Sequence, residues 1–347
     1  MSPTLGLRCV ACQAPLHRED RFCEACGAER ADDAPATEMR AVPPATTEAA
    51  GTPTTEESPV GCRACGAPAS AIAPDRYCTV CGVRVRAPED RHELDLGCAA
   101  AVTDRGLRRR ENEDAFHLEL AGDGVVAVVC DGVSTSIAGA LAARSAAAAA
   151  GAVLRDALLE GLRATDATAR AIDTAQDAVA ALAIPVGLGA DSPSCTLVSA
   201  LWCDDEVVVG CVGDSRAYWI GADDQRQLTT DDSWAAEQIA DGLLSEEQAA
   251  ADRRAHAITR WVGADGPEHP RQVVTHALTA PGRLVLCSDG LWNYARSPVE
   301  LSKLLDSSPV GQPIAAARTL ADIALARGGH DNVTVAVLEP PPRRFES

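Results

Sequence analysis

Aromatic residues are scarce in this chain: Phe, Trp and Tyr make up 3% of its 347 residues. Hydrophobic residues still reach 46%, so a core must consist mainly of aliphatic side chains and alanine. No apolar run approaches the roughly 18 residues that a membrane span needs. The first residues lack the basic region and apolar core of a secretory signal. We therefore expect a cytoplasmic protein with no membrane association, in which thiols stay reduced.

Positive charge is also in short supply, and nearly all of it is arginine. The chain has 50 Asp and Glu against 31 Lys and Arg, a net charge of −19. Residues 1–91 hold 10 of the basic and 13 of the acidic residues, so residues 92–347 hold 21 and 37, a net of −16. This acidic body disfavours nonspecific binding of nucleic acid, and it suits cation binding.

Cysteine is abundant by contrast, and eight of the 14 form four Cys-x-x-Cys pairs arranged as two repeats. The thiolates of two such pairs can hold one tetrahedral ion, and four thiolates favour zinc. Each repeat is too short to fold around its own core, so metal would supply the folding free energy. Disulfides or redox pairs are the alternative. The predicted ligands are Cys9, Cys12, Cys23 and Cys26 in residues 6–30, and Cys62, Cys65, Cys78 and Cys81 in residues 61–86.

The two cysteine repeats resemble zinc ribbons, as found at the ends of bacterial regulatory proteins. Between them, residues 31–60 are rich in Pro, Thr, Ala and Glu. Such a composition buries too little apolar surface to fold, which predicts a disordered linker. We expect the ribbons to dock a protein partner or to self-associate. A nucleic-acid adaptor is a competing hypothesis, which the acidic body disfavours.

From Cys98 onward, apolar strand-like runs alternate with longer helical stretches. Several strands follow one another with short turns between them, which favours antiparallel sheets with packed helices over a parallel sheet. The predicted strands are 98–103, 116–120, 125–130, 195–202, 207–212, 216–220, 273–278, 283–287 and 333–338. The predicted helices are 137–163, 166–182, parts of 233–255, 297–305 and 314–327.

Aspartates sit at the ends of these predicted strands, usually beside glycine. A single Asp-Gly is an ordinary turn signal, but here the arrangement recurs. Carboxylates gathered at one rim of a sheet repel each other unless a cation neutralises them. Oxygen ligands with no His or Cys cluster nearby point to Mg²⁺ or Mn²⁺. The residues concerned are Asp131, Asp214, Asp289 and Asp331.

A basic stretch lies next to an acidic one upstream. Arg108, Arg109 and Arg110 precede Glu111-Asn112-Glu113-Asp114. The planar fork of an arginine can bind two oxygens of a phosphate. This juxtaposition fits a site that holds both a phosphate and metal ions.

Five short motifs occur in the order and spacing of the type-2C metal-dependent protein serine/threonine phosphatases, and the resemblance covers about residues 95–340. It implies a four-layer α+β sandwich of two antiparallel sheets flanked by helices, in a domain over residues 92–340. The segment that runs from 228–231 through 257–260 is similar to the flap of that family and the stretch after it. The motifs are Arg109-x-x-Asn112-Glu113-Asp114, Asp131-Gly132, Val212-Gly213-Asp214-Ser215-Arg216, Ser288-Asp289-Gly290-Leu291 and Gly328-x-x-Asp331-Asn332.

The resemblance also implies roles for individual residues. Asp131 would bridge two Mn²⁺ or Mg²⁺ ions, Asp289 and Asp331 would complete the first, and the carbonyl of Gly132 would reach the second. Arg109 would bind the substrate phosphate, with Arg108 and Arg110 as register alternatives. A water bridging the two ions would attack phosphoserine or phosphothreonine in a protein, and a Ser/Thr kinase is a plausible substrate by analogy. Glu113 and Asp114 would act through waters, and Asp214 would hold a weaker third ion.

One segment departs from the family. After Gly132 a bulky residue and two glycines are usual, whereas this chain has Val133-Ser134-Thr135-Ser136. Val133 cannot act as the general acid proposed for members with histidine there. The departure motivates an alternative, a catalytically weak pseudophosphatase that binds phosphoproteins.

Overall fold

The computed structural model describes residues 7–8, 15–16, 61–62, 65–74, 76–87, 90–136, 138–182, 192–267 and 271–339. The chain divides into two units, Met1–Pro59 and Val60–Ser347. In the first, β1 (Leu7–Arg8) and β2 (Pro15–Leu16) pair antiparallel. The cysteines of the first predicted zinc unit (Cys9, Cys12, Cys23 and Cys26) and the predicted linker over 31–60 lie outside the described residues.

One antiparallel sheet of the second unit has five strands, and most of its residues are buried. Its inner strand β6, between β8 and β5, has the sequence Gly-Val-Val-Ala-Val-Val-Cys-Asp. Side chains alternate along a strand, so Val126 and Val128 contribute to the core under one face, and Ala127 contributes to the core under the other. The strand order is β13 (Gln272–Ala277), β9 (Glu206–Val212), β8 (Leu197–Cys203), β6 (Gly124–Asp131) and β5 (Asp114–Ala121).

The second antiparallel sheet has six strands. Its last strand in sequence, β15, pairs with β4 inside the sheet, from Val333 opposite Asp104 to Leu338 opposite Ala99. The strand order is β11 (Gln225–Gln227), β10 (Arg216–Gly221), β14 (Gly282–Cys287), β15 (Val333–Leu338), β4 (Ala99–Asp104) and β3 (Arg91–Asp95).

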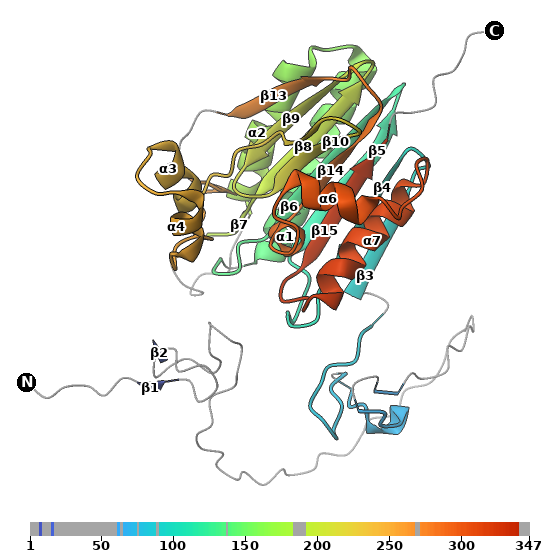
Figure 1. Ribbon diagram of the computed structural model, residues 1–347, viewed down its shortest axis with the longest axis vertical. Coiled ribbons are helices and arrows are strands. Elements are labelled where there is room, and N and C mark those ends of the chain that lie inside the picture. Colours follow the sequence, from blue (N-terminus) through green and yellow to red (C-terminus); the bar gives the residue numbers. More distant parts are fainter. Residues whose placement is uncertain are drawn as a thin grey trace, which may run out of the picture. The chain divides into compact units, whose positions relative to one another are not determined.

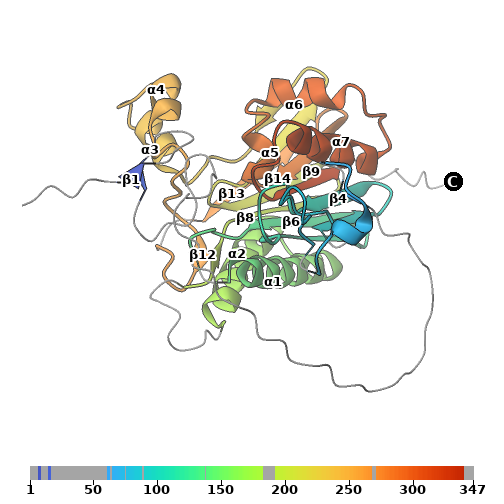
Figure 2. The same cartoon turned by 90° about the horizontal axis from the view of Figure 1, so that it is seen from below.

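Helices cover the outer face of each sheet, which gives four layers (Figures 1 and 2). Helices α1 (Gly139–Glu160) and α2 (Ala164–Ala180) pack on the five-stranded sheet. Helices α5 (Asp289–Trp292), α6 (Pro298–Leu305) and α7 (Pro313–Ala326) pack on the six-stranded one. The predicted α+β sandwich is therefore confirmed. No helix among the described residues has the length and apolarity that crossing a bilayer requires.

The layer between the two sheets consists mainly of alanine, valine and leucine. Among the described residues, two aromatic side chains are buried within it, Trp202 and Trp219, whose ring centroids lie 6.0 Å apart, and Phe116 packs partly buried against it. Small side chains from both sheets allow the sheets to approach closely, as the scarcity of aromatics in the sequence predicts. This close packing fixes where the strand ends lie.

All nine predicted strands are present, with two differences in detail. The run predicted as one strand over 195–202 is divided at Thr196 into β7 (Ser194–Cys195) and β8. The Thr196 N–H keeps the register of the ladder by donating to the Asp131 carbonyl, but the Asp131 N–H donates to the Thr196 side-chain hydroxyl oxygen at 3.2 Å. Three further strands of the second unit were not predicted: β3 and β11 are polar edge strands, and β12 (Val262–Gly263) is a two-residue partner of β7. The helix predicted within 233–255 is two short ones, α3 (Trp234–Ala240) and α4 (Glu246–Ala251).

We predict that Ala127→Leu lowers the free energy of unfolding by about 1–3 kcal/mol, because Ala127 is fully buried between the sheets and a larger side chain overpacks that layer. Urea denaturation of the full chain measures this change. Ala148→Leu is the matched control, since Ala148 is exposed on α1. Equal midpoints for the two variants would contradict the packing described here.

Candidate active site and metal sites

Acidic side chains from both sheets meet at one end of the sandwich. Asp131 ends β6 and lies directly opposite Asp114, the first residue of β5. Asp289 follows β14 as the first residue of α5, and Asp331 lies two residues before β15. Asp214 lies in the turn between β9 and β10. The five aspartates, which span most of the domain in sequence, are thus brought together by the strand order.

The electrostatics of these residues are those of crowded carboxylates. Burial raises the pKa of Asp131 well above its ordinary value, and repulsion from Asp114, Asp289, Asp331 and Asp214 raises it further. Burial and the charges of Asp331 and Asp289 raise the pKa of Asp114 to about 7. Burial and repulsion from Asp331 raise the pKa of Asp289 to about 7, although Asp131 and Arg109 act in the opposite direction. The positive groups of the protein near this cluster therefore compensate only part of the negative charge of the aspartates.

Two buried carboxylate oxygens of the cluster lack a hydrogen-bond donor. Asp114 Oδ1 and Asp289 Oδ1 are buried and have no hydrogen-bond partner. A buried carboxylate oxygen without a donor is costly. An all-oxygen set of this kind suits Mg²⁺ or Mn²⁺. The donors therefore fit the divalent ions that the sequence predicts.

The carboxylate oxygens of this cluster are more widely spaced than the ligand atoms of a preformed metal site. Among the described residues, only the four cysteines between 62 and 81 form a group of three or more metal-binding side chains whose ligand atoms all lie within 4.8 Å of one another. Wider spacing of the carboxylates is compatible with hard ions, which keep several of their waters and bind one or two carboxylates each.

Arg109 reaches the carboxylate cluster. Its Nη2 lies 2.5 Å from Asp331 Oδ2, across 222 residues of sequence. Arg108 and Arg110, the register alternatives, are exposed. One guanidinium of the three consecutive arginines is therefore placed beside the acidic side chains, with about a third of it open to solvent.

Gly132 has no room for a side chain. A Cβ there would lie 2.6 Å from the carbonyl carbon of Gly139, the first residue of α1, and 2.8 Å from the carbonyl oxygen of Glu113. The Gly132 N–H donates to that same Glu113 oxygen at 3.1 Å. Burial raises the pKa of the Glu113 carboxyl. Gly132 and Glu113 are thus held together at the rim next to Asp131.

Three residues that support this site were not singled out from the sequence as site residues. Asn332 accepts from the Glu113 N–H at 2.9 Å, and its amide donates to the carbonyls of Arg105 and Glu111 at 2.8 and 2.9 Å. Ser288 donates to Asp114 Oδ2 at 2.7 Å. Asn332 and Ser288 stand inside recognisable motifs, so their positions were a usable signal.

Asp232 is the third. The Gly213 N–H donates to its Oδ2 at 3.0 Å, and Arg260 donates to its Oδ1 at 2.6 Å. It therefore joins the turn that carries Asp214 to both ends of the 232–260 segment, which contains α3 and α4. No local sequence pattern indicated this role.

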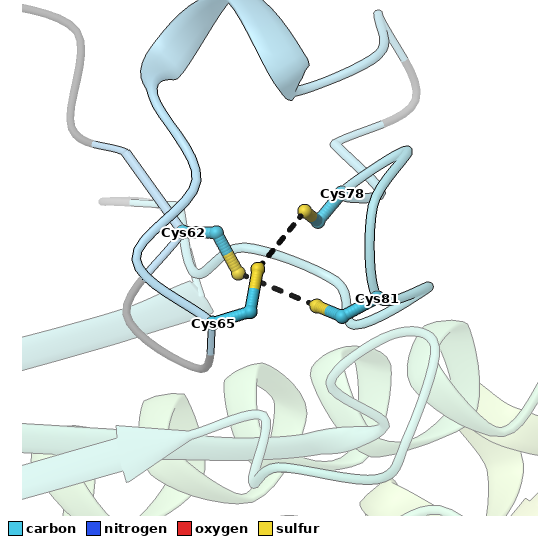
Figure 3. Close-up of side chains that lie close together, drawn as sticks. All are labelled: Cys62, Cys65, Cys78 and Cys81. Carbon is cyan, nitrogen blue, oxygen red and sulfur yellow. Dashed lines mark hydrogen bonds between the residues drawn. The ribbon is translucent and has the colours of Figure 1, made fainter.

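The second cysteine unit forms a compact four-sulfur group (Figure 3). Cys62 Sγ lies 3.6 Å from Cys81 Sγ, and Cys65 Sγ lies 3.7 Å from Cys78 Sγ. Zn–S bonds of about 2.3 Å in a tetrahedron place sulfurs about 3.8 Å apart, so the group fits one Zn²⁺. These separations exclude disulfides among the four cysteines, since an S–S bond is about 2.05 Å.

The thiols of this group are mutually coupled. A hydrogen bond from the Cys81 backbone lowers the pKa of the Cys78 thiol to about 7. A hydrogen bond from the Val83 backbone lowers the pKa of the Cys81 thiol. The neighbouring thiols of Cys62 and Cys78 raise it, and the pKa of Cys81 is raised on balance. Four thiolates so close together need a cation, which agrees with the predicted zinc.

A carboxylate cluster with a guanidinium beside it is suited to metal-assisted hydrolysis of a phosphate ester. Sequence comparison agrees: the family described as Protein phosphatase 2C matches residues 107–319. The serine/threonine phosphatase stp of Listeria innocua is 32% identical over 252 residues, which cover 68% of this chain and 93% of the relative. The serine/threonine protein phosphatase PstP of Mycobacterium tuberculosis is 30% identical over 69% of this chain and 44% of its own length. The chain therefore belongs to the protein phosphatase 2C family.

Solved structures show the same architecture. The PPM Ser-Thr phosphatase MsPP of Mycobacterium smegmatis, solved with cacodylate, matches with a TM-score of 0.57 and 28% identity over 70% of this chain and 98% of that one. The catalytic domain of PstP, solved with two manganese ions, matches with a TM-score of 0.55 and 27% identity over 72% and 98%.

We predict that the stability of the metal-free protein falls as pH rises from about 5 to 8. The folded carboxyls with raised pKa keep protons that the unfolded chain has released. At a pH above the pKa of the folded carboxyl, each unit by which folding raises that pKa therefore lowers the free energy of unfolding by about 1.4 kcal/mol. Thermal denaturation in a chelator measures this trend.

The matched variant for this measurement is Asp131→Asn, which removes a buried carboxyl that four other aspartates repel. It should flatten the pH curve and raise the Tm at pH 8. Because the buffer and chelator are the same, the comparison also controls for zinc loss. Parallel curves for variant and wild type would contradict the repulsion.

Proposed function

We propose that this chain hydrolyses phosphoserine and phosphothreonine in proteins at the site formed by Asp131, Asp289, Asp331 and Arg109. The observation that supports it most strongly is the contact of Arg109 with Asp331, which places a phosphate-binding side chain beside the carboxylates. Membership of the family supports the same reaction.

Arg109 binds the substrate phosphate in this proposal. Its guanidinium is paired with Asp331. A divalent ion held at Asp331 would engage that carboxylate, and the guanidinium fork of Arg109 would then be free for two phosphoryl oxygens. Binding of the ion and of the phosphate therefore support each other.

Asp131 is the central ligand, because its carboxylate is buried and is repelled by Asp114, Asp289, Asp331 and Asp214. Asp289 and Asp331 complete one ion position, the Gly132 carbonyl contributes to the second, and Glu113 and Asp114 act through waters. Asp214 belongs to a weaker third position, and the Trp292 indole N–H fixes the Asp214 carbonyl at 2.8 Å. The divalent ions, when bound, lower the pKa of a water that attacks phosphorus and neutralise charge on the phosphoryl oxygens.

No side chain of the 133–136 segment supplies a proton to the leaving group as a histidine would. Val133 is apolar, and its backbone N–H donates to the Ser194 carbonyl at 3.0 Å. The proton comes from water in this proposal, so the leaving alkoxide of serine or threonine relies on solvent.

In this proposal each segment of the chain has its own role. Residues 92–340 form the catalytic domain, and residues 6–30 and 61–86 each bind one Zn²⁺, separated by the linker over 31–60. The substrates are phosphoproteins of the cytoplasm, and a Ser/Thr kinase is a suitable one. The zinc units dock a protein partner.

We predict that Asp131→Asn reduces hydrolysis of p-nitrophenyl phosphate to the uncatalysed background, because the variant loses the charge that holds the cations. Turnover is measured with Mn²⁺ and with Mg²⁺. Asp123→Asn is the matched control: it lies at the other end of the same β5–β6 hairpin and is exposed. Full activity in Asp131→Asn would refute the site. Phosphopeptide binding without turnover in the wild type would favour a pseudophosphatase.

We predict that Arg109→Ala raises the KM for p-nitrophenyl phosphate about 10–100-fold, the effect of losing hydrogen bonds of about 1.5–3 kcal/mol to a charged group. Arg108→Ala and Arg110→Ala are the controls for register and should change the KM less than threefold. A larger effect at either neighbour would move the phosphate-binding role to that residue.

A further inference from the structure

Arg105 is a buried arginine close to the proposed phosphate-binding residue. It is 3% exposed. One of its amino groups donates to the backbone carbonyl of Arg109. The other side of its guanidinium faces Asp90: Nε lies 3.0 Å from Oδ1 without hydrogen-bond alignment, and Nη2 donates to Oδ2 at 3.4 Å. A buried guanidinium is tolerated only when it is paired in this way.

Asp90 connects Arg105 to the four-cysteine unit. It is 4% exposed, and Arg84 Nη1 lies 2.9 Å from each of its oxygens. Arg84 is part of the cysteine unit, because it pairs with Tyr77 and its neighbour Val83 accepts from the Cys78 N–H at 2.9 Å. One carboxylate is therefore held by an arginine of the cysteine unit and by an arginine of the loop that carries Arg109.

A second ion pair runs beside the first. Arg86 donates to Asp104, which is fully buried at the end of β4. The other oxygen of Asp104 accepts from the Gly106 N–H at 2.9 Å. The start of the 104–109 loop is thus held from the cysteine unit at two points.

The loop has little freedom on its other side. A Cβ at Gly106, where φ is +76°, would lie 2.1 Å from the carbonyl oxygen of Asp331. Leu107 N–H donates to the Gly329 carbonyl at 2.8 Å. A shift of this loop therefore moves Arg109 relative to the segment that carries Asp331.

We propose that Arg105 is a positioning residue for Arg109, and that the metal-loaded cysteine unit acts through Arg84 and Asp90 to hold it in place. This inference rests on the proposed function, which assigns phosphate binding to Arg109. The second zinc unit is then part of the substrate-binding scaffold as well as a docking arm. Loss of zinc, or oxidation of its four thiols, loosens the Arg109 loop and weakens binding of the substrate phosphate.

The first test compares two buried arginines in the full chain. Arg105→Lys keeps the charge but, with one point donor, cannot span both Asp90 and the Arg109 carbonyl. Arg283→Lys is the matched control: Arg283 is also buried, pairs with Glu339 at 2.8 Å and donates to the Ser308 carbonyl at 3.0 Å. It lies at the opposite end of β14 from Asp289.

We expect Arg105→Lys to raise the KM for p-nitrophenyl phosphate and the inhibition constant of inorganic phosphate on the order of tenfold, with a smaller change in kcat. Arg283→Lys should lower the Tm without changing either constant. Hydrogen exchange of the amides in 105–113 should accelerate in Arg105→Lys alone. Unchanged constants and unchanged exchange in Arg105→Lys would overturn the positioning role.

The second test concerns the metal. Cys62→Ser/Cys65→Ser should remove one zinc per chain, accelerate exchange in 105–113 and raise the KM in the same direction as Arg105→Lys. Cys98→Ser/Cys203→Ser, two part-buried cysteines outside the group, is the thiol control. Loss of zinc with unchanged exchange and unchanged KM would overturn the coupling. A wild-type protein without turnover would refute the proposed function instead, and the exchange measurement would still decide the positioning of the loop.

Discussion

The constraint on which the site depends is the mutual repulsion of carboxylates at the strand ends. Asp131, Asp114, Asp289 and Asp214 are each placed by a separate strand or turn, and burial and mutual charge raise the pKa of every one of them. Hydrogen-bond donors of the protein satisfy only some of these carboxylate oxygens, so the cluster is suited to binding cations. The ion pair between Arg109 and Asp331 compensates part of the negative charge.

The sandwich must be rigid to maintain that arrangement. Two antiparallel sheets pack through small aliphatic residues, with the aromatic residues Trp202 and Trp219 buried in the layer between them. Helices close both outer faces. Because β15 and β4 pair inside the six-stranded sheet, the first and last motifs of the domain are adjacent, and Asn332 can hold the loop that precedes Asp114.

Much of this could be predicted from the sequence. Apolar alternation predicts every strand of four or more residues except the polar edge strand β3, and the recurrence of Asp at strand ends predicts the carboxylate cluster. Tertiary contacts could not be predicted. Asp232, which bridges two segments, and the Arg84–Asp90–Arg105 chain join residues whose local sequences look like ordinary charged loops. The Thr196 side chain, which accepts from the Asp131 N–H, lies within a run that predicts one continuous strand. Ion pairs between distant loops leave no periodic signal. For the same reason, a domain start at residue 92 separates Asp90 from its partner Arg105.

The central claim is that the carboxylate cluster binds divalent ions and that Asp131 is its main ligand. Calorimetric titration of the full chain with Mn²⁺, after zinc has been restored to the cysteine unit, tests it most directly. The account predicts at least two bound Mn²⁺ per chain in the wild type, and loss of both in Asp131→Asn with the fold intact. Equal Mn²⁺ binding by the two proteins would contradict it.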